Sequence, residues 1–263
     1  PIFRPSMPDL MNRDLLNRYA NPGQFMRASA RIMPWVLRAG LAVTVVGLFW
    51  GLAFAPRDWQ QGDTVRLMYL HVPAAWMAMG LYLGLGVSAV LALVWKHPLA
   101  ELAGAAIAPV GAAFTIVCLA TGSLWGRPMW GAWWVWDARL TSVLVLLFLY
   151  AGYIALAGAF DDPRRGSRAA AILALVGLVN LPVIKFSVDW WNTLHQPSSV
   201  TRLGAPGIHI EILAPLLVSA VGFTLLGAGL VLLRLRTEVF AARARALMEA
   251  RAARPIAAES VAA

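Results

Sequence analysis

One stretch of the sequence, from Trp125 to Asp137, is unusually rich in tryptophan. It reads WGRPMWGAWWVWD, and five of the twelve tryptophans of this 263-residue chain fall within it. These five are Trp125, Trp130, Trp133, Trp134 and Trp136. Ordinary helices and strands do not need that density of indole rings. Indole faces stack on other π-systems and bring contact area at little cost in side-chain entropy. The stretch is therefore predicted to be a surface that binds a large, flat, apolar ligand.

Two of the four histidines are candidates for binding iron beside this surface. His71 lies in the segment YLHVP, and His195 lies in the segment NTLHQP. Neutral imidazole is a common iron ligand, and two histidines on opposite faces of a porphyrin hold its iron in six-coordination. A lone histidine is more often only a polar interfacial residue. His97 is interpreted in that way, and His209 is interpreted as a spare residue near the candidate ligands.

Charged residues border the tryptophan stretch and allow two interpretations. Arg127 and Arg139 bracket the stretch, Arg66 and Arg202 lie in neighbouring segments, and Asp137 ends it. A haem carries two propionates, and arginine binds carboxylates through its forked N–H groups. The alternative is a local role, in which Asp137 caps the following helix and Arg139 pairs with Asp137. Both interpretations remain open at this point.

The composition of the chain indicates which elements must position these residues. The chain is 60% hydrophobic and 13% charged, about half of the roughly 25% charged residues of soluble domains. Several apolar runs exceed the roughly 18 residues that indicate a transmembrane helix. We therefore predict an all-α integral membrane protein with six transmembrane helices. The predicted spans are Trp35–Ala55, Val72–Trp95, Glu101–Gly122, Leu140–Phe160, Ala169–Val188 and Glu211–Leu233.

The distribution of positive charge predicts the orientation of the spans. If the N-terminus is cytoplasmic, 16 of the 22 Lys and Arg residues lie on the cytoplasmic side and six on the other. The positive-inside rule then places both termini in the cytoplasm. This organisation gives a cytoplasmic N-terminal segment 1–34, a membrane domain 35–235 and a basic cytoplasmic tail 236–263. The tail is expected to lie on membrane lipid or to extend the last helix.

The same orientation places the tryptophan stretch in the second outer loop. Ten of the twelve tryptophans map to the outer half of the protein. An interfacial belt of tryptophans is the alternative explanation, but a belt does not account for this asymmetry. The net charge of +9 follows the membrane topology, so nucleic-acid binding is excluded. The chain contains neither a CxxCH motif for covalent haem attachment nor a phosphate-binding glycine loop.

The extended motif WGRPMWGAWWVWDARLTS closely resembles the WWD signature of a superfamily of haem-handling membrane proteins. Within that superfamily the sequence is similar to the family of cytochrome c maturation protein C (CcmC, haem exporter protein C). The segments YLHVPAAW and DWWNTLHQPSS resemble the histidine segments of the same family. The resemblance covers residues 35 to 235, and the three motifs occur in the expected order.

The resemblance implies a function in the biogenesis of c-type cytochromes. Haem b would bind non-covalently at the periplasmic face of the bacterial inner membrane, against the WWD segment, with iron held by His71 and His195. The protein would deliver haem to the periplasmic chaperone CcmE. The small membrane subunit CcmD would stabilise that complex, and the ABC transporter subunits CcmA and CcmB would release the loaded chaperone.

We therefore expect a haem-handling and transfer protein, associated with an ATPase but not itself an enzyme. Two alternatives are a transmembrane haem transporter and a haem-b subunit of a respiratory complex. The first predicts polar groups at mid-membrane, for which the Asn180 and Pro182 pair is the best candidate. The second predicts histidines within the spans, whereas both candidate ligands are expected at one edge.

Overall fold

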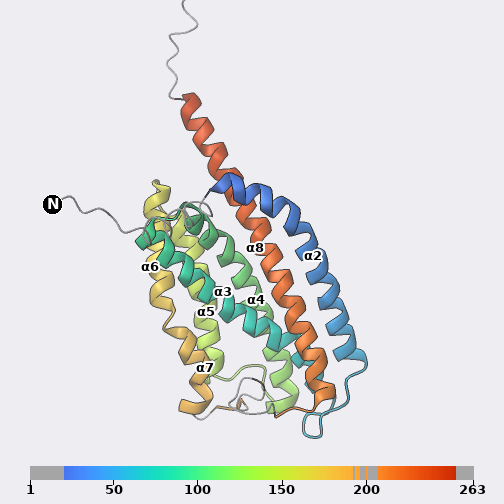
Figure 1. Ribbon diagram of the computed structural model, residues 1–263. Coiled ribbons are helices and arrows are strands. Elements are labelled where there is room, and N and C mark those ends of the chain that lie inside the picture. Colours follow the sequence, from blue (N-terminus) through green and yellow to red (C-terminus); the bar gives the residue numbers. More distant parts are fainter. Residues whose placement is uncertain (1–20, 192, 196–199, 201–206, 253–263) are drawn as a thin grey trace, which may run out of the picture.

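The computed structural model describes residues 21–191, 193–195, 200 and 207–252, and within these residues the chain forms helices and no strand (Figure 1). The helices are α2 (Pro22–Ala53), η1 (Asp63–Leu67), α3 (Met68–Trp95), α4 (Pro98–Trp130), α5 (Ala138–Gly158), α6 (Pro163–Gly177), α7 (Asn180–Trp190) and α8 (Ile210–Ala252). Six helical segments of the described chain are long and apolar enough to cross a membrane. The predicted all-α class with six spans is thus confirmed. The predictions for residues 1–20 and 253–263, and for Arg202, fall outside the described residues.

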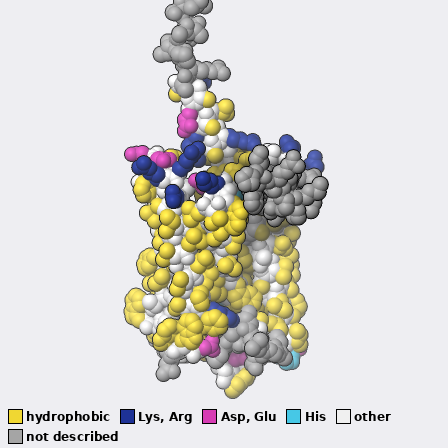
Figure 2. Space-filling model, turned by 60° about the vertical axis from the view of Figure 1, so that its left-hand side comes forward, with side chains coloured by type: hydrophobic (Ala, Val, Ile, Leu, Met, Phe, Trp, Pro, Cys, Tyr) yellow, Lys and Arg dark blue, Asp and Glu magenta, His cyan; other side chains and the backbone are white. Residues whose placement is uncertain are grey.

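The helices form one elongated bundle. Helix α2 packs along α8, α3 packs against α4 in the middle, and α5 packs against α6 and α7 (Figure 1). The start of α2 and the end of α8 lie at the same end of the bundle. Apolar side chains cover its sides, and Lys and Arg side chains gather at that same end (Figure 2).

Helix α4 is longer than predicted and includes part of the tryptophan stretch. It continues past Gly122 to Trp130 and ends where Gly131 adopts a left-handed φ of 75°. Glycine adopts this conformation without steric penalty. In it, Gly131 donates its backbone N–H to the carbonyl of Arg127, which closes the end of the helix. The expectation that the whole stretch is a loop was therefore wrong for residues 125–130. The helix continues beyond the apolar run, because tryptophan and arginine residues can also be helical.

The first histidine segment also differs from expectation. The short η1 helix leads directly into α3, so His71 lies in the first turn of a helix rather than at the end of a loop. At the other end of the chain, residues 236–252 of the basic tail continue α8, which is 43 residues long. Residues 22–34 are likewise continuous with the predicted first span.

The fifth span is broken, as the proline within it predicts. Pro182 has no N–H to donate to the carbonyl of Leu178, where an unbroken helix would have a hydrogen bond. Helix α6 ends at Gly177 and α7 begins at Asn180. The side chain of Asn180 donates to the backbone carbonyl of Ser142 on α5, at 2.8 Å. Asn180 thus has a structural partner at the break.

Aromatic side chains fill the middle of the bundle. Tyr82 and Tyr150 are fully buried, and their rings meet edge to face with centroids 5.0 Å apart. The hydroxyl of Tyr150 donates to the carbonyl of Ala78 at 2.8 Å. The ring of Tyr150 lies directly against Gly111, where any Cβ would occupy the same space. This contact brings α4 and α5 close together, and it fixes the position of α5, at whose start the candidate site lies.

Candidate functional site

A large cavity lies at the end of the bundle opposite the basic end. Its volume is about 940 Å³, at the upper end of the roughly 300–1,000 Å³ of small-molecule and cofactor sites. Side chains from α3, α4, α5, α7 and the segment before α8 line it. They include the predicted site residues His71, Trp125, Trp130, Arg139 and His195. Residues more than 120 positions apart in the sequence thus meet at one cavity.

The imidazole of His71 is fixed by α4. Its Nδ1 lies 3.0 Å from the carbonyl oxygen of Cys118 and 3.0 Å from the hydroxyl of Thr121. A carbonyl only accepts, and the hydroxyl of Thr121 already donates to the carbonyl of Val117 at 2.7 Å. Nδ1 therefore carries the proton, and Nε2 keeps the lone pair that a metal requires.

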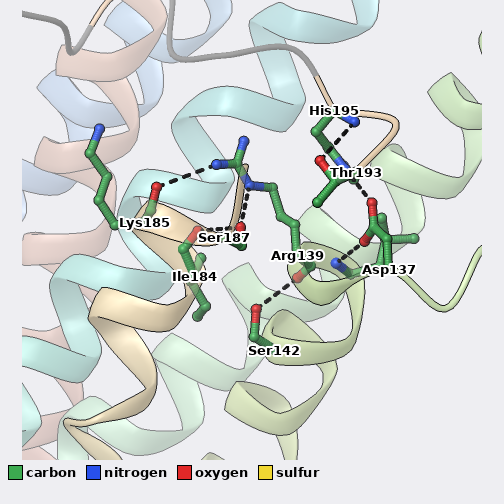
Figure 3. Close-up of polar contacts among 9 residues, drawn as sticks. Asp137, Arg139, Ser142, Ile184, Lys185, Ser187, Thr193 and His195 are labelled. Atoms are coloured by element: carbon green, nitrogen blue, oxygen red, sulfur yellow. Dashed lines mark hydrogen bonds and ion pairs between the residues drawn. The ribbon is translucent and has the colours of Figure 1, made fainter. Parts of the chain in front are cut away.

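His195 is fixed in the same tautomer by a different partner. Its Nδ1 lies 2.8 Å from Oδ2 of Asp137, and its backbone N–H donates to the hydroxyl of Thr193 at 3.2 Å (Figure 3). The His195 side chain is 19% exposed and the Asp137 side chain is 8% exposed. Burial lowers the pKa of His195, while Asp137 raises it and only partly offsets that effect. The imidazole is therefore neutral at neutral pH, with Nε2 unprotonated.

Asp137 has a second bond that ties it to the fold. Its Oδ1 accepts the backbone N–H of Leu140 at 2.8 Å, so Asp137 is the N-cap of α5. An N-cap satisfies one of the N–H groups that have no partner within the first turn. The predicted capping role is confirmed, and the same carboxylate also binds His195. The position of His195 is thus coupled to the start of α5.

Arg139 lies in the first turn of α5 and faces α7. Its Nε donates to the hydroxyl of Ser187 at 3.2 Å, and its Nη2 donates to the carbonyl of Lys185 at 3.4 Å (Figure 3). Its hydrogen bonds therefore go to α7, and not to Asp137 as the local interpretation predicts. Arg139 also lines the cavity and brings a cationic side chain to its wall, whereas the Lys185 side chain points away from Arg139 (Figure 3).

The five tryptophans of the stretch divide into two groups. Trp125 meets His71 edge to face with centroids 5.7 Å apart, and Trp130 meets His195 at 4.8 Å. These two lie on α4 and line the cavity. The other three, Trp133, Trp134 and Trp136, follow Gly131 and are not among the lining residues.

Two members of the second group, Trp133 and Trp136, are exposed, and Trp134 is partly buried. Trp133 is 57% exposed and Trp136 is 77% exposed. Trp134 packs edge to face on Trp136 at 5.4 Å. Arg127 is also outside the lining, and its Nη1 donates to the carbonyl of Gly131 at 2.6 Å. Arg127 therefore stabilises the end of α4, and the structure does not bring it to the cavity.

Sequence reasoning missed several residues that build this site. Thr121 supports His71, and Gln61 accepts the indole N–H of Trp125 at 3.1 Å. Met68, Met79 and Ile184 supply apolar lining. Nothing in the local sequence distinguishes these residues from others of their type in the same helices. Their roles follow only from the packing of α3, α4, α7 and the segment before η1.

Comparison with known proteins identifies the family. The family model described as "Heme exporter protein C" matches residues 15–250. The chain is 52% identical to "Heme exporter protein C" of Bradyrhizobium diazoefficiens over 235 residues, covering 89% of each chain. It is 53% identical to "Heme exporter protein C" of Escherichia coli K12 over 224 residues, covering 85% of this chain and 90% of that protein.

A more distant relative extends the comparison beyond bacteria. The chain is 44% identical to the "Putative cytochrome c biosynthesis ccmC-like mitochondrial protein" of Marchantia polymorpha over 202 residues. That match covers 77% of this chain and 86% of the relative. The family match spans the six membrane-crossing helices and every residue of the cavity. The chain therefore belongs to the heme exporter protein C family.

Proposed function

We propose that this protein binds haem b non-covalently in the cavity and passes it to the chaperone CcmE during the biogenesis of c-type cytochromes. Nε2 of His71 and Nε2 of His195 would be the axial ligands of the iron. One observation carries the proposal: both histidines line the same cavity, and each has its Nδ1 proton engaged by an acceptor. Metal-binding histidines characteristically donate their other N–H in this way.

The chemistry of the lining fits a haem as cargo. Apolar side chains suit the porphyrin, and the edges of Trp125 and Trp130 lie against the two histidines. Arg139 gives the wall a positive charge that suits a propionate. Arginine offers five N–H donors, so its two bonds to α7 still allow a bond to a carboxylate. The names of the relatives, which refer to haem export, support the same cargo.

Transfer requires that part of the cargo be reached from outside the cavity. The exposed tryptophans Trp133 and Trp136 lie next to the cavity and would contact CcmE or the haem edge. Stacking and two coordinate bonds would orient haem without a covalent link, so that its removal needs only non-covalent and coordinate bonds to break. CcmD would stabilise the complex with CcmE, and the ABC transporter subunits CcmA and CcmB would act in the release of the loaded chaperone.

The distribution of charge supports the proposed side of the membrane. Lys and Arg side chains gather at the end of the bundle opposite the cavity (Figure 2). By the positive-inside rule that end faces the cytoplasm. The cavity would then open toward the periplasm from the inner membrane, where CcmE receives haem.

The test of ligation is the absorption spectrum and haem content of the purified protein. We expect His71→Ala and His195→Ala each to remove the six-coordinate spectrum and to lower haem content and CcmE loading. His97→Ala is the matched control, because His97 lies just before α4 at the other end of the bundle. Retention of the six-coordinate spectrum and of CcmE loading in both ligand variants would show that the assignment is wrong.

The surface tryptophans need a separate test. Replacing Trp133 and Trp136 by alanine should leave haem bound but reduce its transfer to CcmE. Replacing Trp130, which contacts His195, should instead alter the spectrum of bound haem. If CcmE loading is unchanged without Trp133 and Trp136, these side chains belong only to an interfacial belt.

A further inference from the structure

We propose that Asp137 is a positioning residue that sets the tautomer of His195, so that the aspartate of the WWD motif controls whether His195 can bind iron. The inference rests on the proposed function only for its consequence in haem binding. The tautomer itself is a property of the chain without haem. Asp137 would act through His195 and need not touch haem.

The buried carboxylate of Asp137 uses each of its two oxygens for a different hydrogen bond. Oδ1 accepts the backbone N–H of Leu140, and Oδ2 accepts Nδ1–H of His195, both at 2.8 Å. A carboxylate can accept at both oxygens, since neither carries a proton to donate. The helix cap holds the carboxylate in place, and the carboxylate then dictates which imidazole nitrogen is protonated. In this arrangement the lone pair stays on Nε2.

An amide of the same shape cannot reproduce this arrangement. Asparagine has one oxygen that accepts and one NH₂ group that donates. Its oxygen would take the cap of Leu140, because asparagine is as good an N-cap as aspartate. The NH₂ group would then face Nδ1 of His195 and make Nδ1 an acceptor. The proton would move to Nε2, as the wrong tautomer forms when the aspartate of a serine protease triad becomes asparagine.

His71 lacks this vulnerability because its acceptor is a backbone carbonyl. The carbonyl of Cys118 accepts its Nδ1–H whatever side chain stands at position 118. The two candidate ligands are therefore fixed by different means. The tautomer of His71 depends on the register of α3 against α4, whereas the tautomer of His195 depends on the identity of the side chain at position 137.

The first experiment measures the tautomer in haem-free protein by ¹⁵N NMR after selective labelling of histidine. We expect His195 to carry its proton on Nδ1 in the natural sequence and on Nε2 in Asp137→Asn. Asp162→Asn is the matched control, because Asp162 also caps a helix, by accepting the N–H of Arg164 at 2.9 Å. An unchanged His195 tautomer in Asp137→Asn would overturn the proposal.

The second experiment measures haem affinity and the six-coordinate fraction in Asp137→Asn and Asp137→Ser. Loss of a partner behind a metal-binding histidine lowers affinity by about 10- to 100-fold, and we expect a loss of that order in Asp137→Asn. Serine can still cap Leu140 but leaves Nδ1 of His195 free, so Asp137→Ser should retain more six-coordinate haem than Asp137→Asn. Equal loss in both variants would mean a purely structural role and would overturn the proposal.

The two experiments separate this inference from the proposed function. If the natural protein bound no haem, the proposed function would fail, yet the NMR measurement would still decide the role of Asp137. If the natural protein binds haem and Asp137→Asn binds it equally well with an unchanged spectrum, the proposed function stands and the inference fails.

Discussion

A single methyl group added on α4 should disturb His71 without removing any hydrogen-bonding group. Gly122 lies beside the imidazole, and a Cβ at this position would lie 3.0 Å from Cε1, 3.5 Å from Nδ1 and 4.0 Å from Nε2 of His71. The ring cannot turn away freely, because Nδ1 is bound to the carbonyl of Cys118 and to Thr121. Gly122→Ala therefore pushes on the ring at a point where it is fixed.

The geometry sets the magnitude of the effect. Ordinary contacts between carbon atoms lie at about 3.5–4.0 Å, so Cε1 must move by roughly 0.5–1 Å. Metal–ligand distances tolerate only about 0.2 Å, so Nε2 would no longer sit where iron requires it. Overpacking destabilises the folded protein by about 1–3 kcal/mol. Alanine in place of glycine in a helix stabilises the folded protein by up to about 1 kcal/mol and so offsets part of this loss. We expect a small net loss of stability but roughly a tenfold loss of haem affinity, since about 1.4 kcal/mol corresponds to a factor of ten.

The assay is haem titration of purified protein, with thermal unfolding measured on the same samples. Gly80→Ala is the control, because Gly80 lies on the same helix as His71 and a Cβ there has no atom within 4 Å. That variant should bind haem normally and unfold at the same or a higher temperature. Normal haem affinity and an unaltered spectrum in Gly122→Ala would refute the claim that the fixed position of His71 matters.

Two further predictions test the packing and the orientation. Gly111→Ala should destabilise the protein by about 1–3 kcal/mol or more through overpacking, because its Cβ would overlap the buried ring of Tyr150. A lowered unfolding temperature in detergent would reveal this loss. Unchanged stability would contradict the packing described. For orientation, the lone buried Cys118 is first replaced by alanine. Trp133→Cys should then react with a membrane-impermeant maleimide in intact spheroplasts, and Arg165→Cys should react only after permeabilisation, whereas the reverse pattern would invert the proposed topology.

The sequence was sufficient to predict the number and class of the elements. Apolar runs of more than roughly 18 residues indicate transmembrane helices. Pro182 marked the break in the fifth span. The ends of the helices were less predictable, because hydropathy falls before the helix stops. Helix α4 continues through Trp125 to Trp130 until Gly131 turns the chain. A capping glycine was a better signal for that end than the loss of apolar residues.

The site could be predicted as a set of residue types but not as an arrangement. The two histidines, Trp125, Trp130 and Arg139 were expected near one another, and they line one cavity. The sequence did not separate Trp125 and Trp130 from Trp133 and Trp136, because the turn at Gly131 decides which indoles face the cavity. Arg127 illustrates the same limit, since its bond to Gly131 takes it to the helix end.

Local sequence carries no information on how the histidines are held, because their partners lie far along the chain. His71 is 47 residues from Cys118 and 50 from Thr121, and His195 is 58 residues from Asp137. Each of these contacts depends on helix packing that assembles only in the folded bundle. The carbonyl of Cys118 would be present with almost any side chain, whereas the two bonds at position 137 need the two accepting oxygens of a carboxylate. The identity of one side chain therefore matters most where the helix cap and the histidine share a carboxylate.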